Sequence, residues 1–567
     1  MLINMNKFLF YGTILCASIF YQNIFGQYLP KNTSPEDLKK AEQWVDQTYQ
    51  SLNDEEKLGQ LFIVALYSNK GNAHVQQVRD LVNQEKIGGI ILMQDNAKKE
   101  IAWVNEFQKS SKIPLLVGMD AEWGLYQRIS SAHKFPWAIT LGAIQNNHLI
   151  YEMAAQIAED AKKMGVNWNF APVVDVNTNP NNPIIGNRSF GSDVNNVIQK
   201  GLAYTQGLQD HQVLAAIKHF PGHGDTDKDS HLDLPVVSHP LSRLNKIELA
   251  PFKALVDKGV GGIMVAHLYV PALESQKGIP ASISHSIVTD LLKNQLGYKG
   301  LIITDALNMG AIAKTYQPGE LDAKAFAAGE DIMLFSQGVK EGKRLILQQI
   351  QEGKIPKSRL EESVKKILLT KYLLGLTHFK ELDASNIDNE INNHKHALLS
   401  EKLYANALTL LKNKEHNLPL KKEEKVYYLP LEEAPYDTFY QELSQKTQLE
   451  IIQAKDLSNI TPDSKIIIGL HKDNSTAYKP YKISATSKNI LKEASKNHRV
   501  ILALFGSPYA LKDIDLHTIT SVVVAYENNT FSQKATAKAL AGETKIHGRL
   551  PVLVNENLAA GDGKNLN

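Results

Sequence analysis

The segment from Lys218 to Pro235 concentrates side chains that can do chemistry. It reads KHFPGHGDTDKDSHLDLP and brings histidines, aspartates and lysines together with glycines that allow sharp bends. It follows an apolar run, 213–217, which predicts a buried strand ending in a turn. Titratable groups crowded at a strand end are costly unless they pair, bind a metal or take part in a reaction. We therefore expect the functional site at this loop.

A single carboxylate, Asp305, follows another apolar run, Leu301–Thr304. One interpretation is structural, because aspartate is a common N-cap and a helix could begin over 306–309. The functional interpretation is a nucleophile. A carboxylate held where strands end can attack the anomeric carbon of a sugar and form a covalent glycosyl intermediate.

Asp229 and His231 could supply the second half of such a reaction. Side chains two residues apart on a loop can fold toward each other, and a carboxylate can then fix the imidazole tautomer and raise its basicity. Histidine titrates near neutrality, so it suits proton donation followed by proton removal. The pair therefore predicts general acid/base catalysis, although two carboxylates are more usual in glycoside hydrolysis.

A metal site is the competing interpretation of the same loop. The residues with suitable ligand types for zinc or iron are His219, His223, Asp225, Asp229 and His231. A His-x-x-x-His spacing binds metal well on a helix, but Pro221, Gly222 and Gly224 make a helix implausible there. The metal interpretation is therefore the less favoured one for this loop, and no cofactor is expected.

Between about residues 61 and 336, apolar runs alternate with amphipathic segments. The runs that predict strands lie over 61–66, 87–93, 115–119, 166–176, 213–217, 261–266, 301–304 and 331–335. They look apolar throughout, as parallel strands covered on both faces should be. Eight such strands alternating with helices predict a (β/α)8 barrel, a TIM-like fold.

Polar residues collect where these predicted strands end, which supports a barrel independently of any motif. They are Asp120, Lys218, His219, His267 and Asp305. Barrel enzymes keep their chemistry at the C-terminal ends of the strands. Asp120 and Glu122 could bind substrate hydroxyls or pair with Arg128, and Arg188 alone could be a surface charge.

Beyond about residue 360 the pattern changes. We predict a barrel domain over 27–376, a polar linker over 377–396 and a second α/β domain over 397–567. Strands of the second domain are expected over 426–431, 466–470, 500–505, 522–526 and 550–554, and the last residues, about 555–567, are expected to be frayed. This domain has no dense cluster of titratable groups, which favours a structural or substrate-shaping role.

Composition and the N-terminus limit the classes of function. The 567 residues carry a formal net charge of only +2, so nothing suggests nucleic-acid binding.

The N-terminus predicts a signal peptide over 1–26, because Lys7 is followed by a short apolar stretch and small residues; the alternative is an uncleaved anchor helix. The single cysteine, Cys16, follows the bulky Leu15, which disfavours lipid attachment. We expect an exported protein, periplasmic or secreted, without a membrane span in the mature chain.

The loop KHFPGHGDTDKDSHLDLP and the run ITDAL resemble glycoside hydrolase family 3, in its bacterial β-N-acetylglucosaminidase branch. Further similarity lies in NFAPVVDV at 169–176, GNRSF at 186–190 and the entrance to the second domain at 407–413. The resemblance extends from about Glu55 to the end of the chain and is most specific in the loop. It implies a TIM-like barrel, an α/β sandwich, retention of anomeric configuration and no metal.

The resemblance also implies a role for each matching residue. Asp305 corresponds to the nucleophile, His231 to the acid/base and Asp229 to its dyad partner. The residues at positions that hold the N-acetylated sugar are Asp120, Arg188, Lys218 and His219. The implied activity is exo-acting release of terminal N-acetylglucosamine from peptidoglycan fragments or chito-oligosaccharides.

One departure from the branch's D-Q-E-G-G-R-V pattern follows the third predicted strand. Here the sequence is DAEWGLY, so Trp123 and Leu125 replace a small residue and an arginine, which predicts an altered subsite near the non-reducing sugar. Three alternatives to a β-N-acetylglucosaminidase remain: a β-N-acetylglucosaminide phosphorylase, a β-glucosidase of the same family, and a non-catalytic wall-binding protein.

Overall fold

The protein divides into two compact units. The structure, a computed structural model, describes residues 30, 33–94, 96–227 and 234–567. Unit 1 consists of the described residues up to Ala132 together with Ala154–Val174 and Tyr204–Ile391. Unit 2 consists of His133–Met153, Asp175–Ala203 and Asn392–Asn567. The predicted domain limits stay a prediction, and the predicted signal peptide lies outside the described residues.

Unit 1 is built around eight parallel strands in the order β7-β6-β5-β4-β3-β2-β1-β8. They are β1 Phe62–Leu66, β2 Gly89–Leu92, β3 Leu116–Met119, β4 Trp168–Asn169, β5 Leu214–Phe220, β6 Gly262–Val265, β7 Leu301–Thr304 and β8 Met333–Leu334. β1 pairs with β8, and an isolated bridge joins Ile303 to Ile332, so the sheet is nearly closed. The predicted (β/α)8 barrel is confirmed.

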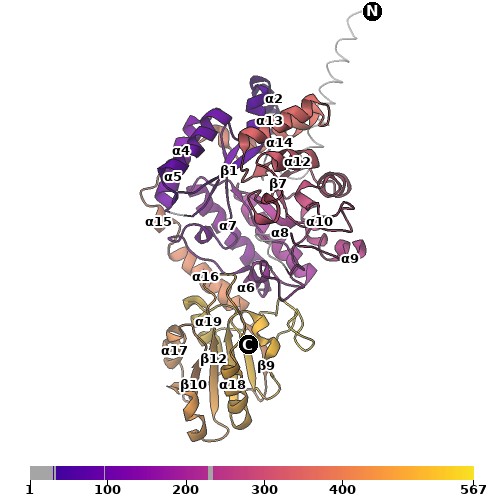
Figure 1. Cartoon of the computed structure of the whole chain (residues 1–567). Coiled ribbons are helices and arrows are strands. Elements are labelled where there is room, and N and C mark those ends of the chain that lie inside the picture. Colours follow the sequence, from indigo (N-terminus) through magenta and orange to yellow (C-terminus); the bar gives the residue numbers. More distant parts are fainter. Residues whose placement is uncertain (1–29, 31–32, 95, 228–233) are drawn as a thin grey trace, which may run out of the picture. The chain divides into compact units, whose positions relative to one another are not determined.

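Helices alternate with the barrel strands along the chain (Figure 1). Those in unit 1 are α2 Pro35–Ser51, α3 Asp54–Gly59, α4 Asn72–Asp80, α5 Ala97–Ser110, α9 Leu241–Lys246, α10 Ala250–Val256, α11 Gly310–Ala313, α12 Glu320–Ala328, α13 Val339–Gln351, α14 Lys357–Leu373 and α15 Ile387–Glu390. A π-helix, η5, spans Ser286–Gln295, and α7 His148–Lys163 and α8 Val194–Asp210 contribute to both units. Local sequence determines where α2 begins, because Ser34 and Asp37 form a capping box there.

The fourth predicted strand is shorter than expected. The apolar run 166–176 forms regular strand only over Trp168–Asn169. Pro172 has no N–H to donate to a strand ladder, which limits regular pairing there. The segment still runs beside its neighbours, since Phe170 N donates to Met119 O at 2.9 Å and Val174 N to Lys218 O at 2.9 Å.

Unit 2 contains a six-stranded mixed sheet in the order β11-β10-β12-β13-β14-β9. The strands are β9 Thr409–Asn413, β10 Lys425–Leu431, β11 Gln448–Ile451, β12 Lys465–His471, β13 Arg499–Phe505 and β14 Ser521–Val524. All neighbours are parallel except β9, which is antiparallel to β14. The helices are α6 Ala138–Gly142, α16 His394–Ala407, α17 Asp437–Ser444, α18 Ala485–Asn497 and α19 Thr530–Leu540. α17 and α19 pack together, and α18 packs on β13, which gives the layered α/β architecture expected for the second domain (Figure 1).

Two local predictions for the C-terminal part are wrong. The segment 550–554 is not a sheet strand; instead Leu550 N donates to Asp562 O at 2.8 Å. The last residues are not frayed, because Leu566 pairs with Ile546 and is buried. Within the described part of the chain, the helices are all too short or too polar to cross a membrane.

Candidate active site

Four of the predicted site residues lie at the C-terminal ends of barrel strands in unit 1. Asp120 directly follows β3, Lys218 and His219 lie near the end of β5, and Asp305 follows β7. The main chain fixes the last of these, since Asp305 N donates to the carbonyl of Val265 in β6 at 2.8 Å. The barrel therefore gathers these groups at one rim, as predicted from the strand ends.

The environment of Asp305 keeps its carboxylate ionised. Its Oδ1 accepts a hydrogen bond from Ala306 N at 2.8 Å. Burial, the largest single influence, raises the pKa, but the imidazoles of His267 and His219, this hydrogen bond and Lys218 together hold the pKa below its usual value. A carboxylate in this state is ready to act as a nucleophile.

Asp305 does not cap a helix. The segment that follows it is a turn, and the next helix, α11, begins at Gly310 after Met309. The interpretation of this carboxylate as a helix N-cap is therefore wrong, and its local hydrogen bond is the one from Ala306 N.

His267 is a neighbour of Asp305 to which the sequence pattern gave no role. Its ring is fully buried; Nε2 lies 3.1 Å from the carbonyl of Ala306 and Nδ1 lies 2.7 Å from Ser282 Oγ. A carbonyl oxygen only accepts, so Nε2 carries a proton, and in the neutral ring Nδ1 accepts from the hydroxyl. The only sequence signal was the position of His267 after a strand; its contacts with Ser282 and Ala306 depend on the folded chain.

Asp120 belongs to a partly buried cluster of charges. Lys218 Nζ lies 2.7 Å from Asp120 Oδ1 and 3.0 Å from Glu122 Oε1, while an Arg128 terminal nitrogen donates to Asp120 Oδ2 at 2.5 Å. Burial raises the pKa of Asp120, but the two cations outweigh it and hold the pKa well below its usual value. Asp120 thus pairs with Arg128, as one interpretation predicted, and also with Lys218. A carboxylate offers about four lone-pair sites, so it can still accept from sugar hydroxyls.

The start of the histidine-rich loop is well packed. The His219 ring lies edge to face with that of His223, with centroids 5.8 Å apart, and both residues are buried. His223 Nδ1 lies 2.7 Å from Thr226 Oγ1. The first part of the loop is therefore held by its own side chains before it reaches Asp229 and His231, which lie outside the described residues.

Arg188 is described with unit 2. It ends a short 3₁₀ helix, Gly186–Arg188, and is 8% exposed, so the interpretation as a surface charge is wrong. One of its terminal nitrogens lies 3.5 Å from the carbonyl of Ile184.

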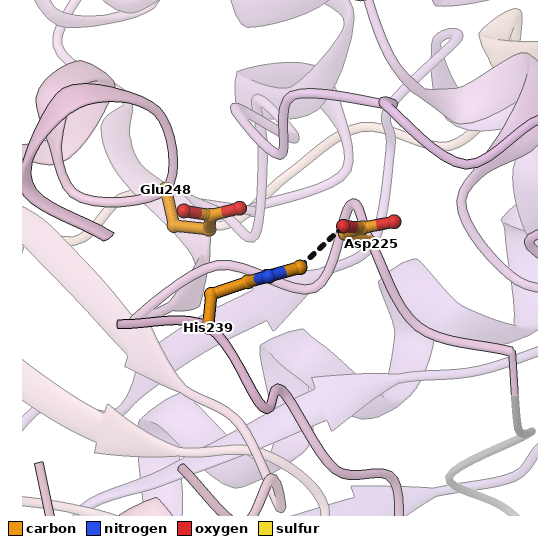
Figure 2. A group of neighbouring side chains, drawn as sticks. All are labelled: Asp225, His239 and Glu248. Atoms are coloured by element: carbon orange, nitrogen blue, oxygen red, sulfur yellow. Dashed lines mark hydrogen bonds and ion pairs between the residues drawn. The ribbon is translucent and has the colours of Figure 1, made fainter. Parts of the chain in front are cut away.

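One group of metal-ligand types lies beside the loop. Asp225, His239 and Glu248 have potential ligand atoms within 4.8 Å of one another (Figure 2). Only Asp225 was named as a candidate ligand from the sequence; His239 and Glu248 lie outside the loop motif and have no recognisable ligand spacing. Arg243 also contacts Asp225, at 2.7 Å.

A barrel with acidic and basic residues at its C-terminal rim is joined in one chain to a mixed α/β sheet, and barrels of this kind carry the active sites of enzymes at that rim. Residues 54–370 match the N-terminal domain of glycosyl hydrolase family 3, which is more than half of the chain. The chain belongs to this family.

Curated relatives carry hexosaminidase names. β-Hexosaminidase A of Pseudoalteromonas piscicida is 33% identical over 385 residues, which are 62% of this chain and 64% of the relative, a little under two thirds of its length. A β-hexosaminidase of Mycobacterium tuberculosis is 33% identical over 332 residues, 56% of this chain and 83% of the relative.

Solved structures share the fold across nearly the whole chain. A family 3 β-N-acetylglucosaminidase from Paenibacillus superposes with a TM-score of 0.73 at 28% identity, covering 89% of this chain and 99% of that one. A β-glucoside phosphorylase superposes with a TM-score of 0.78 at 23% identity, covering 94% of this chain and 99% of the other, a similarity of fold alone.

Proposed function

We propose that this protein is an exo-acting, retaining β-N-acetylglucosaminidase. The observation that carries the proposal is the ionised Asp305 after β7 at the barrel rim, with Lys218 and His219 at the end of β5 and the Asp120 cluster after β3 on the same rim. The hexosaminidase names of the relatives support the N-acetylated sugar as the one recognised.

The proposed reaction is a double displacement. Asp305 attacks the anomeric carbon while the His231 imidazolium, oriented by Asp229, gives its proton to the departing glycosidic oxygen. Neutral His231 then takes a proton from water, whose oxygen attacks the same carbon and releases Asp305. Two inversions restore the starting configuration. Asp120, Lys218, His219 and Arg188 are proposed to hold the sugar hydroxyls and the N-acetyl group.

The first experiment compares a chromogenic β-N-acetylglucosaminide with the matching β-glucoside, and follows the anomer released by proton NMR. We expect hydrolysis of the first with a β product, and Asp305→Ala should lose at least about 10⁴-fold in kcat while its unfolding midpoint changes little. A β-glucosidase would prefer the glucoside. A wall-binding protein would turn over neither substrate, and an active Asp305→Ala variant would remove this residue from the mechanism.

A phosphorylase would use the same nucleophile and replace water by phosphate. Adding inorganic phosphate and assaying the products for sugar 1-phosphate separates the two activities. We expect free N-acetylglucosamine with and without phosphate. Formation of the 1-phosphate as the main product would reject the hydrolase.

We also propose that the protein is exported and acts on N-acetylglucosamine at the ends of peptidoglycan fragments or chito-oligosaccharides. The basic and apolar residues before about position 26 support export. Sequencing the N-terminus of the protein made in a bacterial host tests it: a mature chain starting near Gln27 is expected, and a retained Met1 contradicts cleavage.

A further inference from the structure

Four side chains meet where the segment 226–238 leaves and rejoins the barrel. His239 Nε2 lies 2.5 Å from Asp225 Oδ2, and an Arg243 terminal nitrogen lies 2.7 Å from the same oxygen. The same nitrogen lies 3.4 Å from Oε1 of Glu248, which is 4% exposed. Figure 2 shows Asp225, His239 and Glu248 directed toward one another. Asp225 comes from the loop after β5, and the other three flank or belong to α9.

A metal ion is not the interpretation that these distances favour. Two ligand atoms of a tetrahedral zinc with bonds of about 2.0 Å lie roughly 3.3 Å apart, which is longer than the 2.5 Å between His239 and Asp225. Arg243 also contacts both carboxylates, so its positive charge occupies the place where a cation would be attracted. Asp225 is hydrogen-bonded to His239 and Arg243, whereas Glu248 contacts Arg243 as an ion pair at 3.4 Å without a hydrogen bond.

The same cluster packs under the beginning of the loop. Gly222 has a φ of +129°, and a Cβ built on it would lie 2.8 Å from Cβ of Glu248. The Glu248 residue therefore lies directly against the loop backbone at a position that glycine alone fits without strain. Burial, the largest influence, raises the pKa of Glu248, and Arg243 opposes this rise.

The far end of the segment is also held. Val237 N donates to Tyr269 O at 3.0 Å, and Tyr269 N donates to Pro235 O at 2.9 Å. Asp225 and His239 then join the two ends directly. Fixing the ends of a segment reduces the conformations open to the residues between them.

We propose that Asp225, His239, Arg243 and Glu248 form a clamp that fixes both ends of the segment 226–238 and so positions the acid/base pair Asp229–His231. The proposal rests on the proposed function. These four are positioning residues: none is expected to touch the substrate, and each acts on the reaction through the loop.

Leaving-group dependence tests the clamp. A poor leaving group needs the acid's proton in the first step, whereas a dinitrophenolate departs without it. In Asp225→Asn and Arg243→Met, kcat/KM for a poorly activated aryl N-acetylglucosaminide should fall roughly tenfold to a hundredfold, because small displacements of a catalytic group cost rate of this order. For the dinitrophenyl substrate kcat/KM should change less than about threefold.

Azide gives a second readout. With the dinitrophenyl substrate the variants should be limited by the second step, where base catalysis of water is impaired. Azide needs no base, so it should raise kcat in the variants several-fold and form the β-glycosyl azide, with little effect on the wild type. A purely structural defect would not respond to azide.

Two matched variants complete the design. Arg344→Met removes an exposed arginine that pairs with Glu341 on α13, and it should leave all kinetic values unchanged. Arg243→Lys keeps a cation near Asp225 and should recover part of the activity that Arg243→Met loses. Equal losses of kcat/KM for both leaving groups, or no loss in well-folded variants, would overturn the clamp.

Metal analysis gives a further decisive outcome. Wild-type protein purified without chelator should contain no stoichiometric divalent metal, and EDTA should leave its activity unchanged. One bound metal per chain that is lost in Asp225→Asn would overturn the clamp in favour of a metal site. A wild-type protein without activity would reject the proposed function and, with it, the clamp. An active wild type whose clamp variants are equally active would reject the clamp alone.

Discussion

Lys218 Nζ lies 2.7 Å from Asp120 Oδ1, and the lysine side chain is 3% exposed. These residues come from β5 and the end of β3, which are separated in the sheet by β4. The ion pair therefore spans the short fourth strand, where regular strand pairing is limited to Trp168–Asn169. The ion pair thus links two non-adjacent strand ends.

Breaking this pair should reduce both stability and activity. Lys218→Met leaves the partly buried carboxylate of Asp120 and the buried one of Glu122 without their shared lysine, and we expect a loss of roughly 2–4 kcal/mol in the free energy of unfolding. In Asp120→Asn, Lys218 keeps its ion pair with Glu122. The double variant should lose less than the sum of the single changes, which urea unfolding of all four proteins measures. Strict additivity would show that the two charges do not couple.

Removing His267 should raise the pKa of Asp305. The histidine lowers this pKa in the folded protein, so His267→Asn should make the carboxylate take up its proton at higher pH. The acidic limb of the kcat/KM profile should then move to higher pH. Ser282→Ala, which removes only the partner of Nδ1, is the control and should move the limb less. A limb that stays in place or moves to lower pH contradicts the role of His267.

The barrel could be predicted because its signal is local. Leu301, Ile302 and Ile303 are apolar and, like Thr304 after them, wholly buried, and Asp305 follows at the rim. The approximate limits of seven strands follow from such runs, while Pro172 explains why the fourth is short. Asp120, Lys218, His219 and Asp305 were identified at strand ends for the same reason.

What the sequence missed depends on contacts between distant residues. His239 and Glu248 belong to no sequence motif. They lie near Asp225 only because the chain returns to the barrel at α9, after the loop. The C-terminal residues have a composition typical of a frayed end, yet Leu566 pairs with Ile546. Composition reports local preference and carries no information on such a partner.

Lys371 on α14 is a fully buried lysine that should lower stability at neutral pH. Its Nζ donates to Gln60 Oε1 at 2.7 Å, and burial lowers its pKa to about 7. The unfolded lysine titrates near 10.4, so between about pH 7 and 10 the unfolded chain binds more protons and stability rises with pH. Lys371→Met removes this penalty and should stabilise unit 1 by about 1–3 kcal/mol at pH 6, after the loss of one hydrogen bond, and by much less near pH 10.

Unfolding midpoints of this variant and the wild type at about pH 6 and 9.5 check the sign. Lys365→Met on the same helix is the matched control. Lys365 pairs with Asp46 and Glu361 near the surface, so its loss should change stability by less than about 1 kcal/mol. A destabilised Lys371→Met variant at pH 6 would mean that the hydrogen bond to Gln60 outweighs the buried charge.

His471 should make unit 2 sensitive to acid. Its ring stacks on Phe505 with centroids 4.4 Å apart, and its nitrogens lie 2.7 Å from Tyr428 Oη and 2.8 Å from Asn528 Oδ1. Burial, opposed only by the bond to Asn528, lowers its pKa to about 4. The unfolded histidine titrates near 6.5. Between about pH 6.5 and 4, His471 is therefore protonated in the unfolded chain but remains neutral in the folded chain. Stability is therefore lost through this window, by roughly 3 kcal/mol in total.

The slope of the unfolding midpoint of unit 2 against pH checks this prediction. His471→Gln lowers the midpoint near pH 7, because ring stacking is lost, but it should flatten the decline between about pH 6.5 and 4. His547→Gln, a change at an exposed histidine of the same unit, should leave the slope as in the wild type. An equally steep decline in His471→Gln would assign the acid sensitivity to other groups, of which His133, buried and with its pKa lowered to about 4, is the next to replace.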